Sequence, residues 1–248
     1  MTKQFDSVWL REPRQPKASG LRLDHIVGAA VELLDAEGLD SLSMRKIGAK
    51  LDAGATSLYW HVANKDELLE LVLDEFWGMV EVPDSEDAPW REVLSTFAYN
   101  FRDTLRAHGW SASLIGQLPS MGPNALRLTD RLRRAYIRAG FRGIDIYLAS
   151  GTVMSYVLGI VTPEIAWAKT YGDVDINRQS IVQMMEAVAG DYPDMLSEYR
   201  ALAPVSPEAA RAMAFDFGLL CLLDGLEHRL PESSGEPSGD RSADAGLS

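Results

Sequence analysis

Apolar residues recur every three to four positions in almost every segment from residue 21 to residue 230, and this spacing constrains the fold more than any other feature. One stretch has apolar residues at i, +3, +4, +7, +11 and +15, namely Trp90, Val93, Leu94, Phe97, Phe101 and Leu105. That spacing places these side chains on one face of a helix. No segment of useful length alternates apolar and polar residues as a half-buried strand does. The sequence therefore predicts an all-α protein.

Length and charge limit the classes of function. The 248 residues are enough for one or two domains with a real core. The formal net charge of −12 excludes a uniformly basic nucleic-acid coat, so any contact with DNA must come from a local patch. The single cysteine, Cys221, rules out an intrachain disulfide and fits a reducing compartment.

Two segments bear on localisation. Residues 1–20 are polar and lack the apolar region of a secretory signal, so we expect a cytoplasmic protein. Residues 146–163 carry no charge and are at the short limit for a membrane span. A helix packed against its neighbours explains this segment better, so we expect no membrane partner.

Turn and cap signals between the periodic segments set the expected limits of the helices. The first helix begins at Leu23 and is stopped by Gly38. The other expected helices span residues 44–51, 55–60, 65–81, 90–108, 124–139, 144–166, 176–189 and 207–230. Asn64, with Glu67 three residues later, makes a capping-box-like start for the helix over 65–81.

A short helix, a tight turn and another short helix follow one another between residues 43 and 60. Ser43 caps the first helix, and Asp52, Ala53 and Gly54 make the turn. This order predicts a helix-turn-helix. As a pattern alone it is a weak signal, because short helix pairs are common in all-α proteins.

The residues themselves are more specific than the pattern. Residues 42–51 (LSMRKIGAKL), 57–62 (SLYWHV) and 64–69 (NKDELL) resemble the DNA-binding domain of the TetR family of regulators, in identity and in spacing. This resemblance covers residues 22–81. In the turn, Asp52, Ala53 and Gly54 replace residues that are common in the family, which leaves the next helix with a weaker cap.

A fainter resemblance extends through the rest of the chain. Residues 90–102, 215–219 and 224–227 look like parts of the tetracycline-repressor-type regulatory domain. The helices expected over 144–166 and 207–230 carry more apolar surface than one small domain can cover, which predicts a homodimer. A homodimer with one helix-turn-helix per subunit should bind a palindromic double-stranded DNA operator. If the form without ligand binds DNA and a small-molecule effector releases it, the protein is a repressor.

Composition and resemblance together divide the chain into four regions. They are a flexible arm (1–20), a helix-turn-helix DNA-binding domain with its connecting helix (21–82), a ligand-binding and dimerisation domain (83–230), and a disordered tail (231–248).

Side-chain chemistry and the resemblance together nominate the DNA-binding residues. Thr56 and Ser57 supply hydroxyl groups at the start of the recognition helix, and Arg45 can reach guanine bidentately from the helix before it. Trp60 belongs to the same surface. The resemblance implies phosphate contacts for Ser43, Lys46, Tyr59, His61 and Lys65. Core packing is the alternative for Tyr59 and Trp60, and plain solvation is the alternative for Lys46.

The charge of this region is nearly balanced. Eight basic and seven acidic residues precede Asp52, a balance of only +1. We therefore expect Glu32, Asp35 and Glu37 to lie on helices that face away from DNA, and binding to depend strongly on salt.

Aromatic and apolar residues of the second domain are the candidates for an internal effector cavity, which would suit an apolar or aromatic small molecule. They are Phe97, Phe101, Trp110, Leu114, Ile115, Met121, Met154, Val157 and Trp167. Plain core packing is the alternative for each of them. Tetracycline repressors hold a drug–magnesium complex through two histidines, and the resemblance aligns those positions with Glu81 and Ile115, so we expect no metal and no cofactor.

No enzyme motif is present: the chain has no nucleophile elbow, P-loop, dinucleotide fingerprint or HExxH. We therefore expect no catalytic residues. Four arginines at helical spacing, Arg127, Arg131, Arg134 and Arg138, favour a solvated face paired with acids over a nucleic-acid patch. The alternative to a DNA-binding regulator is a helical small-molecule sensor or interaction protein whose headpiece no longer binds DNA.

Overall fold

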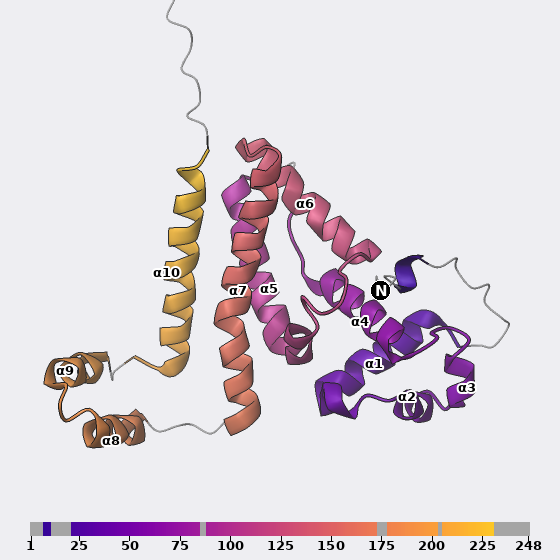
Figure 1. Ribbon diagram of the computed structural model, residues 1–248, viewed down its shortest axis with the longest axis horizontal. Coiled ribbons are helices and arrows are strands. Elements are labelled where there is room, and N and C mark those ends of the chain that lie inside the picture. Colours follow the sequence, from indigo (N-terminus) through magenta and orange to yellow (C-terminus); the bar gives the residue numbers. More distant parts are fainter. Residues whose placement is uncertain (1–6, 11–20, 85–87, 173–177, 203–204, 231–248) are drawn as a thin grey trace, which may run out of the picture.

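The structure is a computed structural model that describes residues 7–10, 21–84, 88–172, 178–202 and 205–230. Its elements, in chain order, are η1 (Val8–Leu10), α1 (Leu23–Glu37), η2 (Leu39–Ser41), α2 (Met44–Lys50), α3 (Ala55–Leu58), α4 (Lys65–Met79), α5 (Trp90–Ala107), η3 (Gly109–Ser113), α6 (Pro123–Ala139), α7 (Ile144–Tyr171), α8 (Arg178–Val188), α9 (Pro193–Leu202) and α10 (Pro207–Glu227). Figure 1 shows their arrangement. These described residues form helices and no strand, so the all-α prediction is confirmed.

Most helices lie where the periodicity predicts them, and the differences have local causes. α3 ends at Leu58 rather than at residue 60, and α7 continues past Pro163 to Tyr171. Pro163 removes one helix hydrogen bond without ending the helix. The helix α9 has no counterpart among the expected ones, because its segment is short and polar; of its described side chains, Leu196 is buried.

The N-terminal arm differs from its prediction at residues 7–10. Ser7 is buried, and Val8–Leu10 form the 3₁₀ turn η1 against α4 instead of a flexible segment. Val8 and Trp9 pack against the apolar core, which explains why this turn is held in place. The remaining residues of the predicted arm and the predicted tail (231–248) lie outside the described residues.

Helices α1 to α4 form the N-terminal domain around a small apolar core. Ile26 and Leu34 of α1 and Ile47 of α2 are fully or almost fully buried, and Leu68 of α4 packs in the same cluster. Gly38 stops α1 as predicted: its φ is +78°, and its backbone N–H donates to the carbonyl of Leu34 over 2.9 Å.

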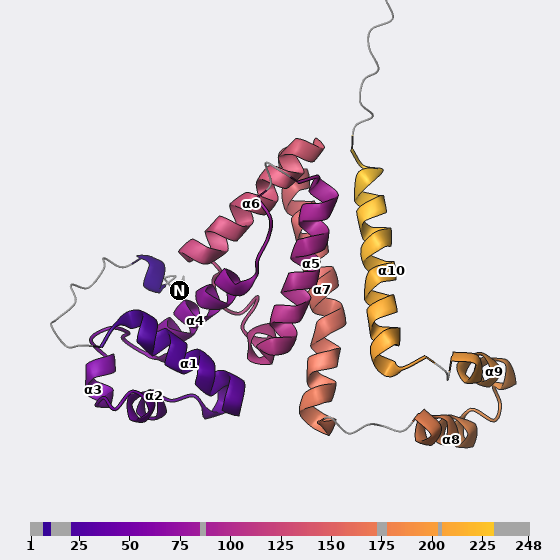
Figure 2. The same cartoon turned by 180° about the vertical axis from the view of Figure 1, so that it is seen from behind.

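Helices α5, α6, α7 and α10 form the second domain. Figures 1 and 2 show α5 between α4 and α7, α10 beside α7, and α8 with α9 at one end. Tyr156 of α7 joins α10 by donating its hydroxyl to the carbonyl of Phe215 over 2.6 Å. Gly218 leaves room for this tyrosine, since a Cβ atom there would lie 2.5 Å from the tyrosine oxygen.

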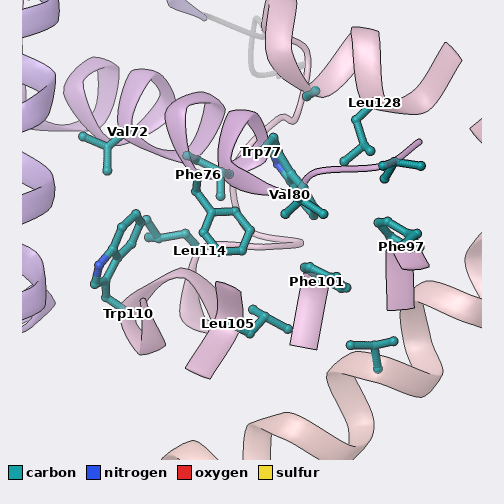
Figure 3. Packing of buried hydrophobic residues seen from close by; sticks show 14 of the residues in the cluster. Val72, Phe76, Trp77, Val80, Phe97, Phe101, Leu105, Trp110, Leu114 and Leu128 are labelled. Carbon is teal, nitrogen blue, oxygen red and sulfur yellow. The ribbon is translucent and has the colours of Figure 1, made fainter. Parts of the chain in front are cut away.

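The two domains share one core, to which α4 contributes aromatic side chains (Figure 3). Phe76 of α4 makes edge contacts with Phe101 of α5 and Trp110 of η3, each with ring centroids 6.2 Å apart. Trp77 stacks on Phe101, with ring centroids 5.3 Å apart. Because aromatic burial contributes strongly to packing, α4 is held by the second domain along its C-terminal half.

Candidate nucleic-acid interface

The helix-turn-helix is built from a capped helix and a left-handed turn. Ser43 begins α2, and its hydroxyl oxygen accepts the backbone N–H of Lys46 over 3.3 Å. Asp52 has a φ of +49°, a conformation that Asp tolerates better than most residues, so the turn forms without the more common glycine. Gly54 precedes α3 and supplies no side-chain cap, as the sequence predicts.

Buried anchors hold the recognition segment and leave its polar and aromatic side chains exposed. Leu58 and Val62 are fully buried. Between them, Tyr59 is 49% and Trp60 is 59% exposed, so the core alternative for these two aromatic residues is wrong. Thr56 is also exposed, as is Arg45 on α2, the helix that packs against α3.

Two acidic residues of α1 lie beside lysines of α2, which corrects the prediction that these acids face away from the DNA-binding surface. Lys46 forms an ion pair with Glu37 and holds the pKa of that carboxyl below its usual value. Lys50 pairs with Glu32 over 2.7 Å. The packing of α1 against α2 brings these charges together, and phosphate would have to compete with the carboxylates for both lysines.

The remaining DNA-binding candidates are half-buried. Ser43 and Ser57 lie at the starts of α2 and α3, and His61 lies in the turn that follows α3. Lys65 is the first residue of α4, where its ammonium lies 3.4 Å from the carbonyl of Leu39. The predicted capping-box-like start is present: Asn64 Oδ1 accepts the Glu67 N–H over 2.8 Å, and Glu67 Oε2 accepts the N–H of Ala63, the residue before the cap, over 2.7 Å.

Most of the predicted effector residues lie in the aromatic core. Phe97, Phe101, Trp110, Leu114 and Val157 are buried, while Ile115 and Met154 are partly buried against the same cluster. Phe97 and Phe101 stack with centroids 5.4 Å apart (Figure 3). Met121 and Trp167 are about half exposed, which differs from the expectation that they line an internal cavity. Met121 precedes α6 and Trp167 lies near the end of α7, so neither position faces the core.

A pocket of about 260 Å³ lies where α4 ends and α6 begins. Trp77, Val80 and Leu128 supply apolar walls, and Arg127 and Arg131 supply positive charge. Arg131 donates to the carbonyl of Val82 over 3.1 Å, and Arg138 donates to that of Ala88 over 2.8 Å. These two arginines therefore bind carbonyls of the connector between α4 and α5 instead of acids, although Arg138 is exposed as predicted. Arg134 does pair with an acid, Asp130, over 2.8 Å.

Two polar contacts also join the domains. Asp74 of α4 accepts the backbone N–H groups of Asn124 (3.2 Å) and Ala125 (3.0 Å) at the start of α6. Asp35 of α1 lies 2.8 Å from His108 Nδ1 and accepts the indole N–H of Trp110 over 2.7 Å. The sequence did not predict either of these contacts between the domains. The one feature that could have indicated a buried role for Asp74 is its place within the apolar run from Leu71 to Trp77.

No cluster of potential metal ligands occurs in the part of the chain that the structure describes. Glu81, at one of the positions aligned with the metal-binding histidines, is exposed, and Ile115 is half-buried. One helix, α7, is long and apolar enough to cross a membrane by composition, which is weak evidence by itself because core helices of soluble proteins pass the same test.

Comparison with known proteins gives consistent matches. The model of the tetracyclin repressor-like C-terminal domain matches residues 82–230, and that of bacterial regulatory proteins of the tetR family matches residues 26–72. A helix-turn-helix transcriptional regulator of Saccharopolyspora erythraea is 38% identical over 196 residues, which are 79% of this chain and 82% of that protein.

Solved structures show the same similarity. ActR of Streptomyces coelicolor in complex with actinorhodin has a TM-score of 0.69 and 28% identity, over 84% of this chain and 97% of that one. BioQ with its double-stranded DNA operator has a TM-score of 0.58 and 27% identity, over 84% of this chain and 99% of that one. Together with the helix-turn-helix and the helical second domain, these matches place the chain in the TetR family of bacterial transcriptional regulators.

Proposed function

We propose that this chain represses transcription as a cytoplasmic homodimer that binds a palindromic DNA operator and is released by a small apolar or aromatic effector. The observation that carries the proposal is the recognition segment, in which buried Leu58 and Val62 hold Thr56, Tyr59 and Trp60 toward solvent. Polar and aromatic side chains that are exposed on and directly after α3 fit a surface that contacts the bases and phosphates of DNA.

Within this interface, we assign base contacts to Arg45, Thr56 and Ser57, because these side chains can meet the edges of bases in the major groove. We assign phosphate contacts to the neighbouring residues whose side chains carry cationic, hydroxyl or ring N–H donors, which are Ser43, Lys46, Tyr59, His61 and Lys65. The relative whose structure contains a DNA operator supports this use of the domain.

A homodimer is supported by apolar surface that one chain leaves open. On α7, Ile144, Tyr147 and Leu148 are 60–70% exposed, and on α10, Phe217 is 72% exposed with Met213 beside it at 62%. The two helices lie side by side (Figures 1 and 2). A pair of such helices from each subunit would form a four-helix interface.

The effector is proposed to act where the domains share their core. Phe101 and Trp110 contact the α4 side chain Phe76 there, and Phe97 stacks on Phe101, so a ligand lodged among these rings would displace α4. The actinorhodin complex of ActR supports an aromatic ligand class. Movement of α4 in both subunits changes the separation of the recognition helices, and a coupling of about 1–3 kcal/mol would lower operator affinity roughly 5- to 150-fold.

A sensor that no longer binds DNA is the second candidate, favoured by one observation: Glu37 and Glu32 already pair with Lys46 and Lys50. Selection of random double-stranded DNA with the purified full chain distinguishes the two. Enrichment of one palindrome supports the regulator. Recovery of unrelated sequences only, at low salt, supports the sensor.

A further inference from the structure

Residues 7–10, named here the N-terminal strap, bind α4 through one buried carboxylate. The hydroxyl of Ser7 donates to Glu70 Oε2 over 2.5 Å, and the backbone N–H of Val8 donates to the same oxygen over 3.2 Å. The backbone N–H of Trp9 donates to the Ser7 hydroxyl oxygen over 3.3 Å, which fixes the turn. Ser7 is 3% exposed, so this contact is part of the protein interior.

Glu70 needs these donors because a second buried carboxylate lies one helical turn away. Glu70 and Asp74 are 6% and 5% exposed. Like charges at this spacing repel, and a buried carboxylate is unfavourable unless hydrogen-bond donors surround it. Asp74 receives two N–H groups from the start of α6. The strap supplies the matching donors to Glu70.

The strap also touches the start of α6. A Cβ atom on Gly122, the residue before α6, would lie 2.5 Å from Cζ2 of Trp9 and would collide with the carboxyl group of Asp74. The strap, α4 and the start of α6 therefore come together at Gly122, which has no side chain. We call the contact of Asp74 with residues 122–125 the α4–α6 joint.

One feature opposes this docking. The indole Nε1 of Trp9 is buried and has no hydrogen-bond partner among the described residues. A buried donor without an acceptor weakens the contact that buries it. The docking thus combines favourable hydrogen bonds with one unfavourable burial.

We propose that the N-terminal strap is an intramolecular ligand of the α4–α6 joint and holds the DNA-binding domain in its operator-binding orientation. The proposal rests on the proposed function, because it is α4 that leads from the helix-turn-helix and α6 that belongs to the regulatory domain. A segment bound to both helices opposes movement of one against the other. An effector that shifts α4 must then also release the strap, which raises the effector concentration required.

Hydrogen exchange of the full chain tests the docking without any DNA. Ser7→Ala and Trp9→Ala should each speed exchange of the Asn124 and Ala125 amides, while Leu10→Ala, at a residue 67% exposed in the same turn, should leave it unchanged. Trp9→Phe keeps the ring contact and removes the unpartnered N–H, so it should leave exchange at Asn124 as slow as in the wild type or slower. Equal exchange in all four variants and the wild type overturns the proposal.

Operator affinity of the same variants tests the role. With the DNA selected by the wild-type chain, Ser7→Ala and Trp9→Ala should lose about five-fold or more in affinity, and Leu10→Ala and Trp9→Phe should not. Faster exchange with unchanged operator affinity would mean that the strap is only structural, and overturns the proposal. If the wild type selects no operator, the proposed function is wrong, and the role of the strap in DNA binding is wrong with it. The hydrogen-exchange data would still show whether the strap binds the α4–α6 joint.

Discussion

Asp74 caps a helix of the other domain: its carboxylate accepts the backbone N–H of Ala125 over 3.0 Å, at the start of α6. A carboxylate at this place satisfies N–H groups that have no partner within the helix and also interacts favourably with the positive end of the helix dipole. The side chain is 5% exposed, so water does not substitute for it. One residue of α4 thus fixes both the stability of α6 and the position of α6 relative to the DNA-binding domain.

Replacing Asp74 by Ala should lower the free energy of unfolding by about 2 kcal/mol, because two backbone N–H groups lose a charged acceptor in a buried place. Urea denaturation, monitored by circular dichroism, measures this free energy of unfolding. Glu75→Ala is the matched control, since that neighbouring carboxylate is exposed and should change the unfolding free energy by less than about 0.5 kcal/mol. Equal losses in the two variants would contradict a capping role.

Removing the charge of Glu37 should strengthen DNA binding. Glu37→Gln releases Lys46 from its ion pair, so the lysine can neutralise a phosphate, and the slope of log affinity against log salt should steepen by about one unit. Fluorescence anisotropy with the selected operator over a range of KCl concentrations measures the slope. Asp40→Asn removes the same charge from an exposed position nearby, and an identical steepening there would show that net charge alone is responsible.

Arg45 and Lys65 should have different effects on recognition. Arg45→Ala should cost about 1–3 kcal/mol on the operator and relax the preference at one base position, since a bidentate base contact is lost. Lys65→Ala should weaken binding to every sequence and reduce the salt slope by about one unit. Binding to a panel of single-base operator variants measures both. Equal losses on all sequences for both variants would contradict the division into base and phosphate contacts.

A charge on α10 should separate the proposed dimer. Phe217 is 72% exposed in one chain, so Phe217→Glu should leave the monomer folded but place a carboxylate in the apolar interface. Light scattering at micromolar concentration should give twice 27.3 kDa for the wild type and 27.3 kDa for the variant. The control is Leu126→Glu on α6, where a leucine 56% exposed lies outside the α7 and α10 faces. A wild type that is monomeric contradicts the prediction.

Local sequence signals are enough to predict the helices and the recognition segment. Helical spacing of apolar residues, the stop at Gly38 and the cap at Asn64 depend on neighbours a few positions away, so they can be read along the chain. The blocks around Tyr59 and Lys65 carry the family resemblance for the same reason. Helix packing, by contrast, is what pairs Lys46 with Glu37, brings Arg131 to the carbonyl of Val82, and brings Ser7 to Glu70, 63 positions away in the chain. Contacts of this kind depend on how helices pack, and a charged residue on a helix gives no local sign of which partner packing will bring to it.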